Sequence, residues 1–187
     1  HKFKYEGMHT LMETVRKGDC AFSLDLSAAY HHVPIAERYW RFFGFEWENE
    51  FFEFCSLPFG LAPACRTFTV LVRALAAHWR SQGIRMVHYI DDWVFFCQPE
   101  EHAALSQRIL KDITDAGFLL NKEKSHGLEK PTFKFSWIGY EIDLSAGNFG
   151  VLEHHVAHVE EQCAALVALP VGARIPALQL MQLLGKL

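Results

Sequence analysis

Two apolar runs separated by an acidic pair make up residues 85–97, which read Arg85-Met86-Val87-His88-Tyr89-Ile90-Asp91-Asp92-Trp93-Val94-Phe95-Phe96-Cys97. Apolar runs of this length on both sides of a short polar turn predict a β-hairpin with Asp91 and Asp92 at its tip. Two carboxylates about 4 Å apart repel by roughly 4 kcal/mol at an effective dielectric constant near 20. Water relieves this repulsion in an ordinary surface turn, where aspartate is common, and a divalent cation relieves it in a metal site.

A third acid, Asp25, lies near the end of the alternating segment Phe22-Ser23-Leu24-Asp25-Leu26, which is typical of a half-buried strand. Taken alone, Asp25 could be a helix N-cap or a surface residue. If its strand lies beside the hairpin, Asp25, Asp91 and Asp92 converge at one edge of a sheet. Such a cluster can hold two Mg²⁺ or Mn²⁺ ions about 3.5–4 Å apart, the arrangement used for in-line phosphoryl transfer. Hard oxygen ligands favour these ions over zinc.

Four segments, in order along the chain, resemble the motifs of reverse transcriptases, most closely those of gypsy-like and DIRS-like retrotransposons. They are residues 22–35 (FSLDLSAAYHHVPI), 57–64 (LPFGLAPA), 89–92 (YIDD) and 118–125 (FLLNKEKS) followed by 135–140 (FSWIGY). The resemblance spans about residues 2–187. It implies the core of a retroelement RNA-directed DNA polymerase, a nucleotidyltransferase that joins a dNTP to a primer 3′-hydroxyl.

The resemblance also assigns roles to single residues. It implies that two Mg²⁺ or Mn²⁺ ions are held by Asp25, Asp91 and the Leu26 carbonyl, with Asp92 completing the acidic cluster. Tyr30 would lie under the incoming sugar and exclude a 2′-hydroxyl. The other residues implied to contact nucleotide are Phe59, Gly60 and Lys124, and those implied to contact primer or template are Tyr89, Trp137, Ile138, Gly139 and Tyr140. The chain departs from the family pattern at Ser27 and Ala28, where relatives often carry a basic and an acidic residue.

Several of these residues also have an ordinary structural explanation. Tyr30 and Trp137 fit core aromatic positions, residues 58–60 fit a strand-to-helix turn, and Lys124 fits an exposed loop. Arginines recur every seven positions along one predicted helix and could meet template phosphates or form a solvated face: Arg66, Arg73 and Arg80. His154 and His158, four positions apart, fit a solvated helix face better than a zinc site, because no HExxH pattern is present.

The overall pattern predicts an α+β fold, a ferredoxin-like polymerase palm whose antiparallel sheet has helices on one face, with the other face free for a duplex and the start of a helical thumb after it. A capping box at residues 10–13 opens a short helix, and residues 41–47 and 51–55 form a fingers-like hairpin. A long helix begins at Pro63 and ends before Gly83, with an apolar face of Phe68, Leu71, Val72, Leu75, Ala76 and Trp79.

A second helix is expected over residues 100–116, followed by a strand at 118–120 and a turn at 147–150. Further helices are expected around residues 156–166 and 176–187. We therefore divide the chain into a remnant of the fingers with a lead-in helix (1–20), the palm (21–143, including the hairpin at 41–55), and a truncated palm-to-thumb connection (144–187).

Composition limits the setting of the protein. Of the 187 residues, 50% are hydrophobic and 14% aromatic, which excludes a disordered segment and allows a substantial core. The five cysteines form an odd set without CxxC spacing, which argues against a disulfide framework and a zinc ribbon and favours a reducing compartment. No long apolar run or signal peptide is present, so we expect a soluble intracellular protein of the cytoplasm or nucleus, with no membrane partner.

The net charge of −4 is unfavourable for a protein that grips phosphates. The expected partners are an RNA or DNA template with its primer, a dNTP, and the remaining fingers, thumb and RNase H regions of a parent polyprotein. The isolated chain should then be weakly active or inactive. Two other functions are compatible with the same residues: a catalytically silent palm that acts as a scaffold, and a ferredoxin-like RNA-binding module.

Overall fold

The structure is a computed structural model that describes residues 4–170 and 172–184. The chain divides into two compact units, His1–Phe133 and Lys134–Leu187. This division falls earlier in the chain than the palm boundary that the sequence predicts after residue 143. Within the described residues, no helix is both long and apolar enough to cross a membrane.

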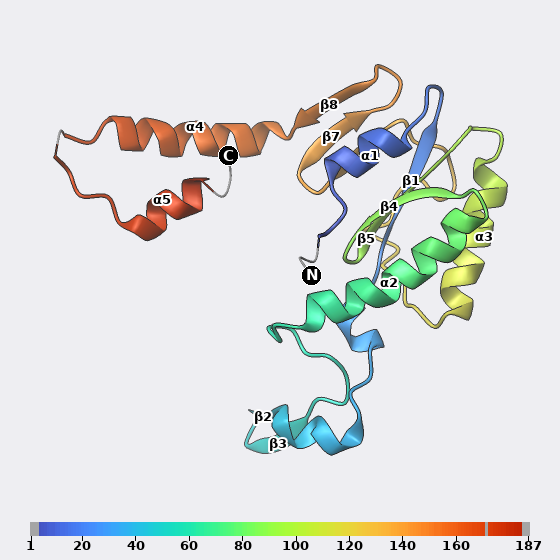
Figure 1. The fold of residues 1–187 in the computed structure, drawn as a ribbon, viewed down its shortest axis with the longest axis horizontal. Coiled ribbons are helices and arrows are strands. Elements are labelled where there is room, and N and C mark those ends of the chain that lie inside the picture. The colour runs from blue at the N-terminus through green and yellow to red at the C-terminus, as the bar shows by residue number, and fades with distance from the viewer. Residues whose placement is uncertain (1–3, 171, 185–187) are drawn as a thin grey trace. The chain divides into compact units, whose positions relative to one another are not determined.

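A three-stranded antiparallel sheet forms the centre of the first unit (Figure 1). Its strands are β1 (Cys20–Asp25), β4 (Arg85–Tyr89) and β5 (Asp92–Cys97), and β5 lies in the middle. The strand and the hairpin predicted from residues 22–26 and 85–97 are therefore confirmed. The alternation of β1 and the apolar runs of β4 and β5 account for this, because successive side chains point to opposite faces of the sheet and both faces are buried.

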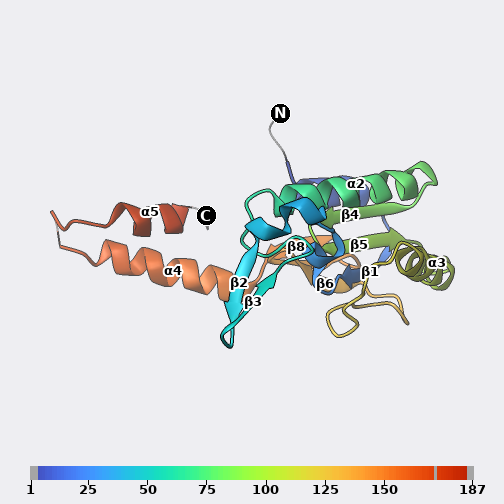
Figure 2. The ribbon, with the colours of Figure 1, turned by 90° about the horizontal axis from the view of Figure 1, so that it is seen from below.

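Two helices cover one face of this sheet (Figure 2). They are α2 (Ala64–Ser81) and α3 (His102–Asp115), and both contribute to a single buried cluster with β1, β4 and β5. The cluster includes Phe22, Leu24, Phe68, Val72, Ala76, Trp79, Met86, Trp93, Phe95, Ile109 and Ile113. Leu71 was expected on the apolar face of α2 but is 44% exposed, because it lies at the border of the buried stripe.

The opposite face of the sheet is buried as well, contrary to the expectation that it is free for a duplex. Ala21, Val87, Val94 and Phe96 lie on that face and are at most 1% exposed. On this face Asp25, Tyr89 and Asp92 at the acidic end are half-buried, and so is Arg85 at the other end of β4.

The predicted strand at residues 118–120 is absent. Leu120 makes a single bridge to Leu26, and two further bridges join Ala21 to Thr132 and Ser23 to His126. The chain turns away after Leu120, because the Ser125 amide donates to the Asn121 carbonyl at 3.0 Å. Isolated bridges thus cover the outer edge of β1 where a fourth strand was expected.

The capping box predicted at residues 10–13 is wrong. Helix α1 (Met8–Thr14) has Gly7 as its N-cap, three residues before Thr10, and this N-cap makes no side-chain hydrogen bond. The Leu11 amide already closes the first turn on the Gly7 carbonyl at 3.1 Å. Thr10 therefore lies inside the helix and cannot cap it.

The predicted hairpin at residues 41–55 exists but is shorter. Two short 3₁₀ helices, η1 (Ala29–His32) and η2 (Glu37–Phe42), precede β2 (Gly44–Trp47) and β3 (Glu50–Glu53). Residues 41 and 42 therefore lie in η2 and not in a strand. The turn consists of Glu48 and Asn49, both with positive φ (51° and 64°), as in the tight hairpin turns whose twist matches that of the strands.

The second unit holds a small antiparallel sheet of β6 (Lys134–Trp137), β7 (Tyr140–Asp143) and β8 (Asn148–Val151), in that order. Of the turn expected at residues 147–150, Gly147 does lie in the turn, but residues 148–150 belong to β8 because Asn148 pairs with Asp143. Helices α4 (Glu153–Val167) and α5 (Ala177–Leu184) follow and confirm both predicted helices. Residues 185–187 of the last prediction lie outside the described residues.

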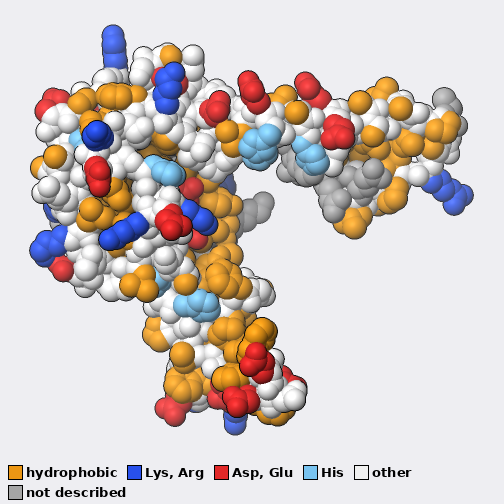
Figure 3. All heavy atoms as spheres, turned by 180° about the vertical axis from the view of Figure 1, so that it is seen from behind, with side chains coloured by type: hydrophobic (Ala, Val, Ile, Leu, Met, Phe, Trp, Pro, Cys, Tyr) orange, Lys and Arg blue, Asp and Glu red, His pale blue; other side chains and the backbone are white. Residues whose placement is uncertain are grey.

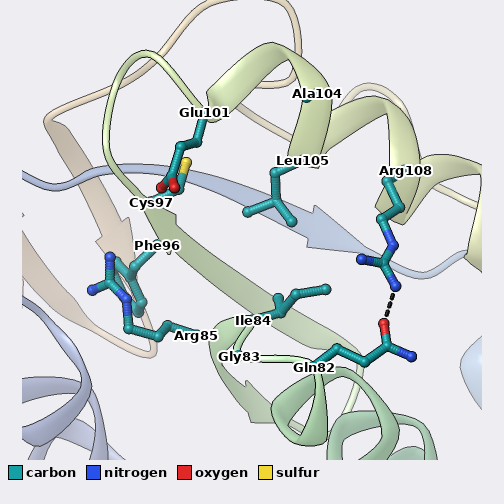
Figure 4. A pocket seen from close by; sticks show the side chains of 10 residues that line it. All are labelled: Gln82, Gly83, Ile84, Arg85, Phe96, Cys97, Glu101, Ala104, Leu105 and Arg108. Atoms are coloured by element: carbon teal, nitrogen blue, oxygen red, sulfur yellow. Dashed lines mark hydrogen bonds between the residues drawn. The ribbon is translucent and has the colours of Figure 1, made fainter.

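A hollow of about 370 Å³ lies at the other end of the β4–β5 ladder from the acids (Figure 4). Arg85 and Phe96 face each other there, whereas Tyr89 and Asp92 pair at the acidic end. Figure 4 shows the hydrogen bond between Arg108 of α3 and Gln82 at the end of α2. The hollow is therefore separate from the predicted catalytic residues.

Candidate active site

Strand register brings the three predicted acids to one end of the sheet. Asp25, the last residue of β1, pairs directly with Asp92, the first residue of β5. Asp91 lies in the turn between β4 and β5, and its carbonyl accepts a hydrogen bond from the Leu26 amide at 3.2 Å. The backbone thus links the end of β1 to the hairpin tip, as the sequence predicted.

The hairpin tip has an unusual backbone conformation. Ile90 has φ 53°, a region that β-branched residues rarely adopt. Its carbonyl accepts a hydrogen bond from the buried Trp93 indole at 2.9 Å, which anchors the turn to the core. Strained backbone of this kind persists only where the surroundings hold it, and it is frequent at functional sites.

A loop after α3 supports Asp25 from the other side, and the sequence analysis did not identify this support. The Asn121 amide donates to the Asp25 carbonyl at 2.8 Å, and the Asp25 amide donates to Ser125 Oγ at 3.1 Å. The Ser125 hydroxyl donates in turn to the Asn121 carbonyl at 2.7 Å. These bonds fix the backbone of Asp25. None of the three uses the Leu26 carbonyl as an acceptor.

The acids repel one another in a partly buried setting. Burial, and after it Asp25 and Asp91, raise the pKa of Asp92 to about 7. Burial and then the Asp25 carboxylate raise the pKa of Asp91 as well, while Lys124 acts in the opposite direction. The predicted lysine is therefore close enough to Asp91 to influence its charge.

The chemistry of these side chains fits divalent cations. Hard carboxylate oxygens that repel each other at a half-buried sheet edge are relieved by an ion such as Mg²⁺. Across residues 4–170 and 172–184, no three or more His, Cys, Asp or Glu side chains are already gathered into a metal-binding group. The acids are thus placed together by the backbone, without being closed into a ligand set.

Comparison with known proteins decides the family. Residues 2–142 match the family described as reverse transcriptase (RNA-dependent DNA polymerase). The chain belongs to the reverse transcriptase family. It is 33% identical over 105 residues to the retrovirus-related Pol polyprotein from transposon gypsy of Drosophila melanogaster, which covers 55% of this chain and 10% of that polyprotein. This reverse transcriptase chain therefore spans only a small part of the relative.

Solved structures agree on the fold. The foamy viral protease-reverse transcriptase in complex with dsDNA matches with a TM-score of 0.75 and 20% identity, over 100% of this chain and 35% of the other. The same viral protein in complex with an RNA/DNA hybrid matches with a TM-score of 0.73 and 19% identity, over 98% of this chain and 23% of the other. The mixed α+β architecture is that of reverse transcriptase structures.

Three of the predicted nucleotide-binding residues lie near the acids or near one another. Tyr30 packs against Phe59, with ring centroids 5.3 Å apart, and Asp91 contributes to a raised pKa of Tyr30 after burial and Cys65. Phe59 is 68% exposed, and Gly60 has φ 82° with open space where a side chain would point. A bound molecule can therefore reach both residues, and a side chain at residue 60 would be strained.

The arginine face of α2 has intramolecular partners that the sequence analysis missed. Arg80 forms a two-pronged ion pair with Glu6 at 2.7 and 2.8 Å, and Arg73 donates to the Lys4 carbonyl. The Glu6 carboxylate also accepts the His88 amide of β4 at 3.0 Å. The N-terminal segment is thus clamped along β4. Arg66 is exposed, and its predicted template contact stays a prediction.

This clamp places an additional aromatic residue at the site. Tyr5 packs against Tyr89 of the hairpin, with ring centroids 5.3 Å apart. No local sequence pattern indicates this contact, because the two residues are far apart in the chain and the segment around Tyr5 has no periodicity. Tyr89 itself is half-buried at the end of β4.

Four of the residues predicted to contact primer or template lie in the second unit: Trp137, Ile138, Gly139 and Tyr140. Ile138 and Gly139 form the turn between β6 and β7, with φ 43° and 86°. Trp137 is 1% exposed, which supports its explanation as a core aromatic, while Tyr140 is half-buried. Ile138 is a second β-branched residue with positive φ, so this turn shares the backbone strain seen at Ile90.

Proposed function

We propose that this chain is the catalytic core of a retroelement RNA-directed DNA polymerase that transfers a nucleotide from a dNTP to a primer 3′-hydroxyl. The observation that carries the proposal is the pairing of Asp25 with Asp92 at the sheet end where Asp91 occupies a strained turn. Membership of the reverse transcriptase family supports the reaction class. In this proposal the sheet of β1, β4 and β5 with its two helices acts as the ferredoxin-like palm of a polymerase, with isolated bridges in place of its last strand.

Two ions of the Mg²⁺ or Mn²⁺ class would be held by Asp25, Asp91, Asp92 and the Leu26 carbonyl. When bound, such ions lower the pKa of an attacking hydroxyl and neutralise charge on the triphosphate and on the leaving pyrophosphate. The acids supply this binding capacity because their mutual repulsion is removed when a cation enters.

Neighbouring residues would bind and orient the substrates. Tyr30, Phe59 and Gly60 form the face for the incoming nucleotide, and the Lys124 ammonium would give a proton to the leaving pyrophosphate as the bond to the α-phosphorus breaks. Tyr89 and Arg66 would contact primer or template, as would the turn of Trp137, Ile138, Gly139 and Tyr140. The RNA/DNA hybrid and dsDNA of the foamy viral structures support a primer-template as partner.

We expect Asp91→Asn to reduce primer extension by more than roughly a hundredfold, because the change removes a charged ligand at the site of transition-state charge. The measurement is extension of a labelled primer on RNA and DNA templates by a polymerase that contains this chain together with its fingers and thumb. The matched control is Asp115→Asn, which changes an exposed acid of α3 that pairs with Lys111. Extension by Asp91→Asn within about tenfold of the parent would contradict the proposal.

A further inference from the structure

A cysteine lies at the meeting point of two tyrosines beside the acids. Cys65 is in the first turn of α2, and its Sγ lies 2.7 Å from the Tyr30 hydroxyl oxygen. Tyr5 is also close enough that Cys65 raises its pKa, second to burial. The position of Cys65 is fixed, because its carbonyl accepts the Thr69 hydroxyl at 2.7 Å within the helix.

The Tyr30 ring packs against two phenylalanine rings and has one polar atom, its hydroxyl oxygen. Phe59 and Phe68 pack against the ring at centroid distances of 5.3 and 5.9 Å. Burial first, then Cys65 and Asp91, raise the pKa of Tyr30, so the phenol stays protonated at neutral pH. A neutral phenol can exchange a hydrogen bond with the thiol, with either group as donor.

We propose that Cys65 is a positioning residue for sugar selection, acting through Tyr30. This inference rests on the proposed function. The sulfur holds the Tyr30 hydroxyl toward α2, so that only carbon atoms of the ring face the place of the incoming sugar. A ribonucleotide then meets a clash at its 2′-hydroxyl and finds no hydrogen-bond partner in Tyr30.

Loss of the sulfur weakens the clash with the 2′-hydroxyl and offers the 2′-hydroxyl a hydrogen-bond partner. The ring gains freedom about its side-chain torsions, and the hydroxyl becomes available to a 2′-hydroxyl. Attraction then partly replaces rejection, and the selectivity between the two sugars falls. The quantity to measure is the ratio of kcat/KM for dNTP to kcat/KM for the matching rNTP, because a purely structural role of Cys65 lowers both values together.

We expect Cys65→Ala to lower this ratio by roughly fivefold, the equivalent of one neutral hydrogen bond. Cys65→Ser keeps a hydrogen-bonding group and should stay within about twofold of the parent ratio. In a Tyr30→Phe background, Cys65→Ala should change the ratio no further, because the hydroxyl on which it acts is gone. Cys55→Ala is the matched control, since it removes an exposed thiol after β3 and should leave the ratio unchanged.

Equal loss of kcat/KM for both sugars, or an undiminished effect of Cys65→Ala in the Tyr30→Phe background, would overturn the inference.

A second measurement does not need polymerisation. Iodoacetamide labelling of the chain, followed by peptide mapping, should show faster alkylation of Cys65 in Tyr30→Phe than in the parent, relative to the exposed Cys55. An unchanged alkylation rate of Cys65 also overturns the inference. The proposed function is tested separately: it is contradicted if the parent polymerase, with its fingers and thumb, extends no primer with dNTP, even when the alkylation rate rises.

Discussion

At the residue scale, Asp92 shows how the site stores electrostatic repulsion. It is paired with one carboxylate across the sheet and adjacent to another in the chain, and it is half-buried. Burial, and after it Asp25 and Asp91, raise its pKa to about 7, from an ordinary value of 3.8. The acid is therefore favourable to the fold when protonated and unfavourable when charged, unless a cation compensates it.

This shift predicts a pH-dependent effect of Asp92→Asn. Because the folded-state pKa is raised, the favourable contribution of protonated Asp92 is complete below pH 3.8 and is lost as pH rises through about 7. The melting temperature of Asp92→Asn should match that of the parent at about pH 4 and exceed it increasingly up to about pH 8. Calorimetry without divalent ions measures this, with Asp115→Asn as control. A difference in melting temperature between Asp92→Asn and the parent that does not vary with pH would contradict the raised pKa of Asp92.

At the element scale, the sequence predicted the elements whose pattern is local. The alternation in β1, the apolar runs of β4 and β5 and the helical period of α2 and α3 predicted the sheet, its helices and the meeting of the three acids. It failed where distant contacts decide: Leu120 makes only one bridge before the loop closes at Ser125, and Asn148 is a strand residue because Asp143 pairs with it. The support of Asp25 by Asn121 and the position of Cys65 beside Tyr30 could not be predicted for the same reason.

The N-terminal segment makes a distant contact that the sequence did not predict, and this contact changes the interpretation of two arginines. Arg80 and Arg73 were candidates for template phosphates, yet both hold residues 4–6 against β4. Glu6 is the centre of this clamp. Burial opposes its charge, but the hydrogen bonds from Arg80 and the nearby His88 keep the pKa of Glu6 below its usual value.

We expect Glu6→Ala to lower the free energy of unfolding by about 2 kcal/mol, because it removes charge-assisted hydrogen bonds from a partly buried site. The His88 amide loses its acceptor and should exchange its hydrogen faster. Thermal unfolding and hydrogen exchange measure the two effects. The control is Glu13→Ala, which removes an exposed acid of α1 that pairs with His9. Equal exchange of the His88 amide in both variants would show that the clamp does not hold β4.

At the scale of the whole molecule, the distribution of charge is at odds with strong binding of nucleic acid. The net charge is −4, and four of the acids that it counts are exposed on the β2–β3 hairpin: Glu46, Glu48, Glu50 and Glu53. In Figure 3 the lower projection shows acidic side chains at its tip and hydrophobic side chains above them. The exposed aromatic residues there include Phe42, Trp47 and Phe51 at 65%, 65% and 85%. This hairpin presents apolar and acidic surface, neither of which attracts phosphates.

We therefore expect residues 1–187 alone to bind a primer-template weakly, with few phosphate contacts. Two to three contacts predict a loss of affinity of roughly 10- to 40-fold between about 50 and 200 mM salt. Fluorescence anisotropy with a labelled RNA/DNA hybrid measures this slope. Mg²⁺ should strengthen binding by the parent more than by Asp91→Asn, because cations at the acidic edge reduce its repulsion of the backbone phosphates. Tight binding that resists salt, or an equal response of both proteins to Mg²⁺, would show that the affinity comes from a surface other than the acidic end of the sheet.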